Sequence, residues 1–196
     1  MEALKAYCMD CRRCPLCETR HNVVFGVGPV RPGGVLFIGE GPGEQEDLQG
    51  EPFVGPAGRL LDEMLSIIDL GRHNCYIANI VKCRPPHNRD PLQVEQAACI
   101  GWLRKQTAIL APKIIVCLGR IAAMKIIHED FRITRDHGQW TEKAGIWFTA
   151  IYHPSALLRD VSKRPDTFAD LLSIRAKVRE LCPELYAGEG SQEEGQ

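Results

Sequence analysis

Residues 35–43 read Val35-Leu36-Phe37-Ile38-Gly39-Glu40-Gly41-Pro42-Gly43, an apolar run that passes directly into a glycine-rich loop. A short run of β-branched and aromatic residues bounded by glycine predicts a buried strand over 35–38. Three other runs share this composition and predict three more strands: residues 76–81, 114–118 and 146–152.

Apolar residues at helical spacing lie between or after these runs and predict helices over 58–70, 92–110, 120–128 and 165–181. Asp90-Pro91 supplies a cap and a proline for the start of the second helix. In the last helix we expect five side chains to face the core: Phe168, Leu171, Leu172, Ala176 and Leu181. Strands that alternate with helices indicate an α/β fold, with a parallel sheet covered on both faces.

The composition fits one globular domain, which we expect over residues 1–186, followed by a disordered acidic tail over 187–196. No apolar run is long enough to cross a bilayer, and the first residues do not resemble a signal peptide, so we expect a cytoplasmic protein. The net charge is -1, but residues 101–182 carry a surplus of basic side chains. That surplus fits either a phosphate-binding face or an ordinary solvated surface.

The chain has nine cysteines, a high count that indicates metal binding or catalysis in a reducing compartment. Four of them form an unbroken C-x2-C-x2-C-x2-C run: Cys8, Cys11, Cys14 and Cys17. Thiolates two residues apart bind one metal or cluster from a tight turn. The site is either local, using these four, or split, using two of them with Cys83 and Cys99. We interpret Cys75, Cys117 and Cys182 as structural.

The segments after the predicted strands contain the candidate binding residues, because ligands of parallel sheets bind beyond the carboxyl ends of the strands. The loop over 39–47 lacks the lysine of a phosphate loop, and its carboxylates would repel phosphate, so a small neutral ligand fits better. Phe53, held between prolines and glycine, is either a stacking platform for a planar ring or a buried loop anchor.

Five motifs occur in order along the chain: residues 39–43, residues 52–55, residues 79–86, residues 88–91 and His153-Pro154-Ser155. Together with the cysteine spacing, they resemble the family 4 uracil-DNA glycosylases, the thermostable iron–sulfur type. This resemblance implies a three-layer α/β/α sandwich with a central four-stranded parallel sheet. It also implies a structural [4Fe–4S] cluster on Cys14, Cys17, Cys83 and Cys99, with Cys8 and Cys11 as extra cysteines.

The resemblance further implies a base excision repair enzyme that flips uracil out of DNA and hydrolyses its N-glycosidic bond. We hypothesise that Phe53 stacks on the base, Asn79 reads its Watson–Crick edge and His153 donates a hydrogen bond to O2. Gly41, Gly43, Glu40 and Glu46 would complete the uracil-binding loop.

Gly41 stands where the best-known members of the superfamily have an aspartate, so Glu40, Glu46 or Asn79 would hold the water. After His153, we expect residues 156–159 to contact DNA, with Leu157 as a wedge and Arg159 on a phosphate. We expect no covalent trap, because the basic insert of a related covalent group is absent. The expected partner is uracil-containing DNA, single- or double-stranded, bound by a monomer. A sliding clamp is compatible with the sequence, but no residue points to one.

Two other classes of protein fit parts of the pattern. An electron-transfer or redox-sensing iron–sulfur protein would use the cysteine run without a catalytic pocket, and leaves Phe53, Asn79 and His153 unexplained. A zinc-stabilised DNA-binding module would use the cysteines but would be colourless.

Overall fold

The computed structural model describes residues 1–186, and the predicted disordered tail over 187–196 lies outside these described residues. The strands are β1 (Val35–Gly39), β2 (Tyr76–Asn79), β3 (Ile114–Leu118), β4 (Thr141–Lys143) and β5 (Ile146–Ile151). The α-helices are α1 (Glu2–Met9), α2 (Leu16–Thr19), α3 (Glu44–Gln49), α4 (Pro56–Ser66), α5 (Gln93–Leu110), α6 (Arg120–Ile126), α7 (Ile133–Asp136), α8 (Pro154–Arg159) and α9 (Arg164–Leu181). Three short 3-10 helices complete the set: η1 (Pro86–Asn88), η2 (Val161–Lys163) and η3 (Pro183–Leu185).

The sheet has the strand order β2-β1-β3-β5-β4. The four strands expected from the sequence are present and pair in parallel, with Leu36 opposite Tyr76 and Val35 opposite Ile114. The prediction of a four-stranded, fully parallel sheet is wrong, because β4 adds a fifth strand antiparallel to β5. Its three residues are exposed and lack an apolar pattern, and Ala144 and Gly145 with positive φ turn the chain between the two strands.

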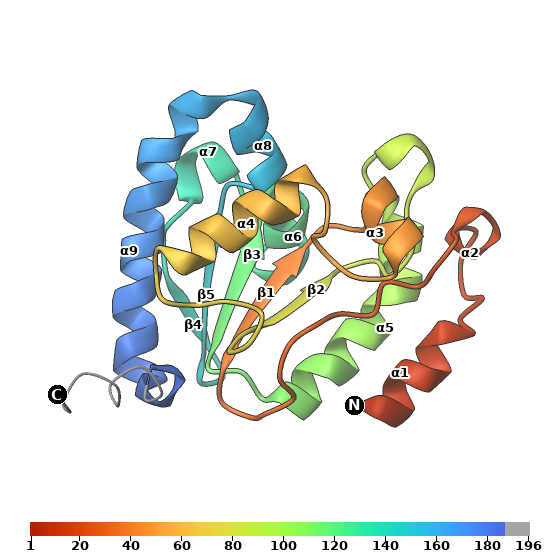
Figure 1. Cartoon of the computed structure of the whole chain (residues 1–196), viewed down its shortest axis with the longest axis horizontal. Coiled ribbons are helices and arrows are strands. Elements are labelled where there is room, and N and C mark those ends of the chain that lie inside the picture. The colour runs from red at the N-terminus through yellow and green to blue at the C-terminus, as the bar shows by residue number, and fades with distance from the viewer. Residues whose placement is uncertain (187–196) are drawn as a thin grey trace, which may run out of the picture.

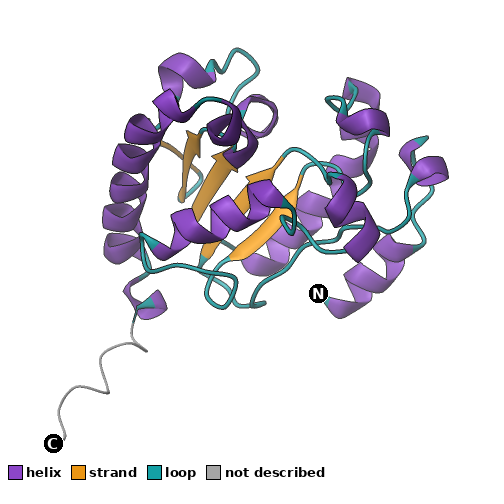
Figure 2. Ribbon diagram, turned by 45° about the horizontal axis from the view of Figure 1, so that its top comes forward, coloured by secondary structure: helices purple, strands orange, loops and turns teal. Residues whose placement is uncertain are grey.

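Helices cover both faces of this sheet (Figure 1; Figure 2). Helices α4, α8 and α9 pack on one face, where Phe37 and Val116 meet Leu61, Leu157 and Ile174. On the other face, Leu36 and Ile115 belong to a core cluster with residues of α1, α5 and α6. The central strands β1 and β3 contain no polar side chain because both of their faces are buried.

The predicted core face of α9 is wrong for three residues, because Phe168, Leu172 and Ala176 are exposed. Phe168 and Leu172 are 49% and 42% exposed, whereas Leu171, Ile174 and Val178 are buried. The buried positions still have helical spacing, but the stripe is rotated from the predicted one and includes the polar residues Thr167 and Asp170. The short helices α1, α2, α3, α7 and α8 are not among the predicted elements.

The two edges of the sheet differ. At the β2 edge, Val27 and Ile77 exchange two backbone hydrogen bonds of 2.9 and 2.8 Å, so the chain before β1 lies along this strand. At the other edge, β4 presents Thr141, Glu142 and Lys143 to solvent. Among the described helices, none is both long and apolar enough to span a membrane.

Candidate active site

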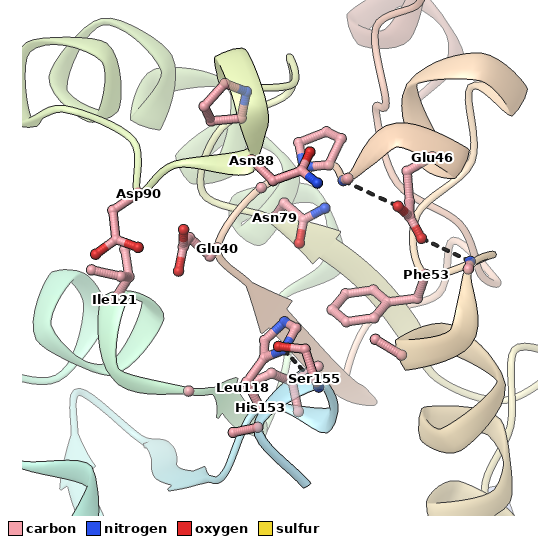
Figure 3. Close-up of a pocket in the computed structure, with 18 of the residues that line it drawn as sticks. Glu40, Glu46, Phe53, Asn79, Asn88, Asp90, Leu118, Ile121, His153 and Ser155 are labelled. Atoms are coloured by element: carbon pink, nitrogen blue, oxygen red, sulfur yellow. Dashed lines mark hydrogen bonds between the residues drawn. The ribbon is translucent and has the colours of Figure 1, made fainter. Parts of the chain in front are cut away.

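A cavity of about 730 Å³ opens where the carboxyl ends of β1, β2, β3 and β5 meet (Figure 3). The topology places the candidate residues there, since parallel strands end at one edge of the sheet. The cavity brings together all the residues predicted to bind or act on the base: Glu40, Gly41, Gly43, Glu46, Phe53, Asn79 and His153.

Phe53 is held in the cavity wall by its backbone. It has a left-handed φ of 56° and is 6% exposed. Gly58 lies so close below it that a Cβ there would be 1.7 Å from the Phe53 carbonyl oxygen, so only glycine fits. Arg72 donates to the carbonyl oxygens of Pro52, at 2.8 Å, and Phe53. These contacts fix the backbone of Phe53, whose side chain belongs to the hydrophobic core cluster under α4.

Glu46 joins two loops. Its Oε2 accepts from the Gly43 N–H at 3.0 Å, and its Oε1 accepts from the N–H groups of Val54 and Gly55, both at 2.9 Å. The carboxylate therefore ties the start of α3 to the segment that follows Phe53. These hydrogen bonds occupy both oxygens, which makes Glu46 a connector of the loops.

Asn79 ends β2 and is 1% exposed. Its side-chain oxygen Oδ1 is buried without a hydrogen-bond partner among the described residues. Gly39 leaves room for it, because a Cβ on Gly39 would lie 2.4 Å from this Oδ1 and 2.6 Å from Phe53 Cζ. A buried oxygen with no partner is costly, so a ligand that donates to it gains the bond that the protein leaves open.

His153 follows β5 and caps the start of α8. Its Nδ1 accepts from the Ser155 N–H at 3.1 Å, which places the proton of the neutral ring on Nε2. Burial, with a smaller contribution from nearby Arg159, lowers the pKa of His153 to about 4. The ring centroid lies 5.7 Å from that of Phe53. His153 is therefore a neutral ring that carries its proton on Nε2 and lies near the Phe53 ring.

Glu40 lies on the other side of the cavity, near Asp90 (Figure 3). Burial, with a smaller contribution from Asp90, raises the pKa of Glu40 to about 7. Arg120 opposes this shift and forms a 2.7 Å ion pair with Asp90. A carboxyl with this pKa exchanges its proton near neutral pH, as a general base requires.

The packing around position 41 explains why a glycine occupies it. A Cβ at this position would lie 2.7 Å from Val81 Cγ2, so an aspartate here would displace the valine. The loop is therefore built for glycine at this point, and the nearest carboxyl in sequence is Glu40.

One predicted DNA contact needs correction. Leu157 is 2% exposed and packs in the core below α8, so it is not available as a wedge. Its neighbour Leu158 is 45% exposed, and Arg159 lines the cavity. The sequence pair of leucines could not show which one faces the core, because α8 has only six residues.

The lining residues that are absent from the predicted set include four polar ones: Asn88, Asp90, Arg120 and Ser155. Asn88, with a φ of 55°, accepts at Oδ1 from Arg84 Nε at 2.7 Å. Asn88 and Asp90 belong to the motif over residues 88–91, and Ser155 belongs to the motif that begins with His153. Membership of these motifs is the sequence signal that points to the three residues. Arg120 had none, since only the fold brings it to Asp90.

A second, smaller cavity is lined by five cysteines: Cys11, Cys14, Cys17, Cys83 and Cys99. Three of their sulfurs receive N–H groups: Trp102 Nε1 donates to Cys11 at 3.3 Å, Arg20 to Cys83 at 3.1 Å and the Lys82 backbone to Cys99 at 3.2 Å. Cys8 is fully buried nearby, and the three cysteines interpreted as structural, Cys75, Cys117 and Cys182, are buried elsewhere.

The five thiols surround a space and do not converge on one point. Within residues 1–186, no group of three or more His, Cys, Asp or Glu side chains is arranged to hold a single metal ion. A polynuclear iron–sulfur cluster is held by several cysteine thiolates, and five cysteines line this one cavity. N–H donors to sulfur also suit cysteine ligands of such clusters.

Comparison with known proteins gives a consistent result. The family model described as the uracil DNA glycosylase superfamily matches residues 25–174. The chain is 44% identical over 184 residues to a type-4 uracil-DNA glycosylase of Archaeoglobus fulgidus, covering 89% of each protein. It is 41% identical to that of Sulfurisphaera tokodaii, over 95% of this chain and 87% of that protein. A third, from Thermotoga maritima, is 43% identical over 83% and 85% of the two chains.

Proposed function

Because this chain belongs to the uracil DNA glycosylase superfamily, and within it to the type-4 uracil-DNA glycosylases, we propose that its larger cavity receives a uracil flipped out of DNA. The protein is an N-glycosylase that removes uracil from DNA in base excision repair. An enzyme of this kind must take its base out of the stack to reach the glycosidic bond. The assignment of roles to residues is our proposal.

The observation that carries the proposal is the unpartnered Oδ1 of Asn79. Uracil presents an N3–H donor and an O4 acceptor on its Watson–Crick edge, which match the oxygen and the NH2 group of one amide. Cytosine presents an acceptor at N3 and a donor at N4, so it would leave that buried oxygen without its ring N–H partner. Phe53 would stack on the base face, since its ring lies in the same cavity wall.

His153 is proposed to stabilise the charge that grows on the departing base. As the N-glycosidic bond breaks, negative charge develops on uracil O2, and a fixed donor then binds the transition state more strongly than the ground state. The Ser155 N–H orients the ring so that Nε2 carries the proton. A neutral imidazole does this without giving up a proton.

Glu40 is proposed to position and deprotonate the water. Glu46 already accepts three backbone hydrogen bonds, whereas Glu40 has a pKa of about 7 and lines the cavity. The polar cavity near Asp90 and Arg120 gives a water several partners. Leu158 and Arg159, on α8 beside His153, would then contact the DNA around the vacated position.

We further propose a [4Fe–4S] cluster on Cys14, Cys17, Cys83 and Cys99, at the cavity that these residues line with Cys11. When bound, the cluster stabilises the fold, and hydrolysis of a glycosidic bond requires no electron transfer. It would join the irregular segment around α2 to the end of β2 and to α5.

The test is a labelled duplex with one U·G pair, followed by alkaline cleavage of the abasic site. The cluster-loaded protein should release uracil from this duplex, so that alkali cleaves the strand, and should leave a C·G duplex intact. Asn79→Ala and His153→Ala should each slow uracil release by at least about 10²-fold, as removal of one transition-state donor does. Wild-type rates in either variant would remove that residue from the mechanism.

A further inference from the structure

Lys82 is a buried cation that the proposed mechanism does not use. It is 1% exposed, although a lysine is rarely buried without a charged partner. No carboxylate of the described residues pairs with it, and its side chain makes one hydrogen bond, from Nζ to the backbone oxygen of Asn79 at 2.9 Å. The acidic groups that act on it electrostatically are the thiols of Cys99 and Cys8.

The backbone of Lys82 is held as firmly as its side chain. Its N–H donates to Cys99 Sγ at 3.2 Å, and its carbonyl oxygen accepts from the Val24 N–H at 2.8 Å. The residue therefore contacts a cysteine of the smaller cavity through its main chain and Asn79, in the larger cavity, through its side chain. Only three residues separate Asn79 from Cys83, which lines the cysteine cavity.

The negative charge of a bound cluster would explain why a lysine occupies the buried position 82. Cysteines bound to iron are thiolates, so a cluster brings negative charge next to the Lys82 ammonium. That charge stabilises the buried cation, and the cation in turn holds the Asn79 carbonyl. The Phe25 ring, 5.9 Å from Nζ, adds a weaker favourable contact.

We propose that Lys82 is a positioning residue that couples the cluster to base recognition, holding Asn79 in place through its Nζ–carbonyl hydrogen bond. The proposal rests on the proposed role of Asn79 and on a cluster in the cysteine cavity. It gives the cluster an effect on the rate of uracil release without any electron transfer.

The first test replaces Lys82 with methionine, which is one atom shorter, keeps an unbranched apolar side chain and removes the charge and the donor. The single-turnover rate on the U·G duplex should fall roughly tenfold, the equivalent of one charge-assisted hydrogen bond, with KM little changed. The reduction potential of the cluster should become more negative, because a neighbouring positive charge favours the reduced form. Lys125→Met, at an exposed position on α6, is the matched control and should change neither quantity.

A second variant separates the donor from the charge. Lys82→Gln restores an N–H donor near Asn79 but no cation, so it should recover part of the rate and none of the potential. A merely structural lysine would lower the melting temperature of both variants and leave the rate and potential of the folded holoprotein unchanged. That result would overturn the proposal.

A double-mutant cycle with Asn79→Ala distinguishes the inference from the function on which it rests. If Lys82 acts through Asn79, Lys82→Met should have little further effect in the Asn79→Ala background. Additive losses would overturn the coupling and leave the role of Asn79 intact, whereas a fully active Asn79→Ala would refute that role. Should neither Lys82 variant fold, hydrogen exchange over residues 76–82 of the wild type decides. Removal of the cluster should speed amide hydrogen exchange in these residues, and an unchanged exchange rate would refute the coupling.

Discussion

Glu46→Gln tests whether the Glu46 carboxylate holds the stacking ring in place. Glutamine keeps one oxygen, and in its better orientation that oxygen still accepts from Val54 and Gly55, as Oε1 does now. Its NH2 group then faces the Gly43 N–H, which currently donates to Oε2 at 3.0 Å. One charge-assisted hydrogen bond is lost, and two donors oppose each other, at a combined cost of about 2–4 kcal/mol.

This cost falls on the loop that carries Phe53, so the rate of uracil release should drop by roughly 30-fold to 10³-fold. The measurement is a single-turnover time course on a U·G duplex with alkaline cleavage of the product. Glu63→Gln, an exposed residue of α4, removes the same charge and should stay within about threefold of wild type. A Glu46→Gln protein that also stays within threefold would refute the connector role.

Four other outcomes are expected. Gly39→Ala should reduce activity by about 10²-fold or more, because its Cβ would lie 2.4 Å from Asn79 Oδ1. The control Gly34→Ala, whose Cβ would have nothing within 4 Å, should have wild-type kinetics. Equal rates in the two variants would contradict the close packing at Gly39. The single-turnover rate should rise with pH and level off above about 7 as Glu40 loses its proton, and Glu40→Gln should flatten that profile; an unchanged profile would exclude Glu40 as the base. Cys83→Ser should remove the visible absorbance of the cluster and lower the melting temperature of the protein. Cys75→Ser, at a residue outside the cysteine cavity, should leave the absorbance and the melting temperature unchanged. A coloured Cys83→Ser protein would contradict the assignment of Cys83 as a ligand. Leu158→Ala should slow release from duplex more than from single strands, and Leu157→Ala should instead lower the free energy of unfolding by about 2–4 kcal/mol; the reverse pattern would restore Leu157 as the wedge.

The sequence predicts the parallel strands well because burial on both faces requires continuous apolar runs such as 114–118. It does not predict β4, whose residues are exposed on an edge and pair only because a tight turn precedes β5. The buried face of α9 is also set by contacts with distant parts of the chain. Thr167 and Asp170 are buried by contacts that no local pattern contains, since Asp170 binds His137 from the segment after α7.

The candidate site follows a similar division. Residues at or just after the ends of strands, such as Asn79 and His153, are predicted to share a site because the topology brings these strand ends together. Arg120 was missed because its role depends on a partner from another loop, Asp90. The family resemblance implies that Cys11 is an extra cysteine, yet it lines the same cavity as the four expected ligands and accepts from Trp102, which is 91 residues away in the chain.

The unequal edges of the sheet bear on self-association. Exposed strand edges invite pairing with another chain, and proteins counter this with short or charged edge strands or by covering the edge. Here one edge is covered by the segment containing Val27, and the other ends in a three-residue strand with Glu142 and Lys143. Both edges are thus protected against aggregation through added strands, although the sheet between them is almost entirely apolar.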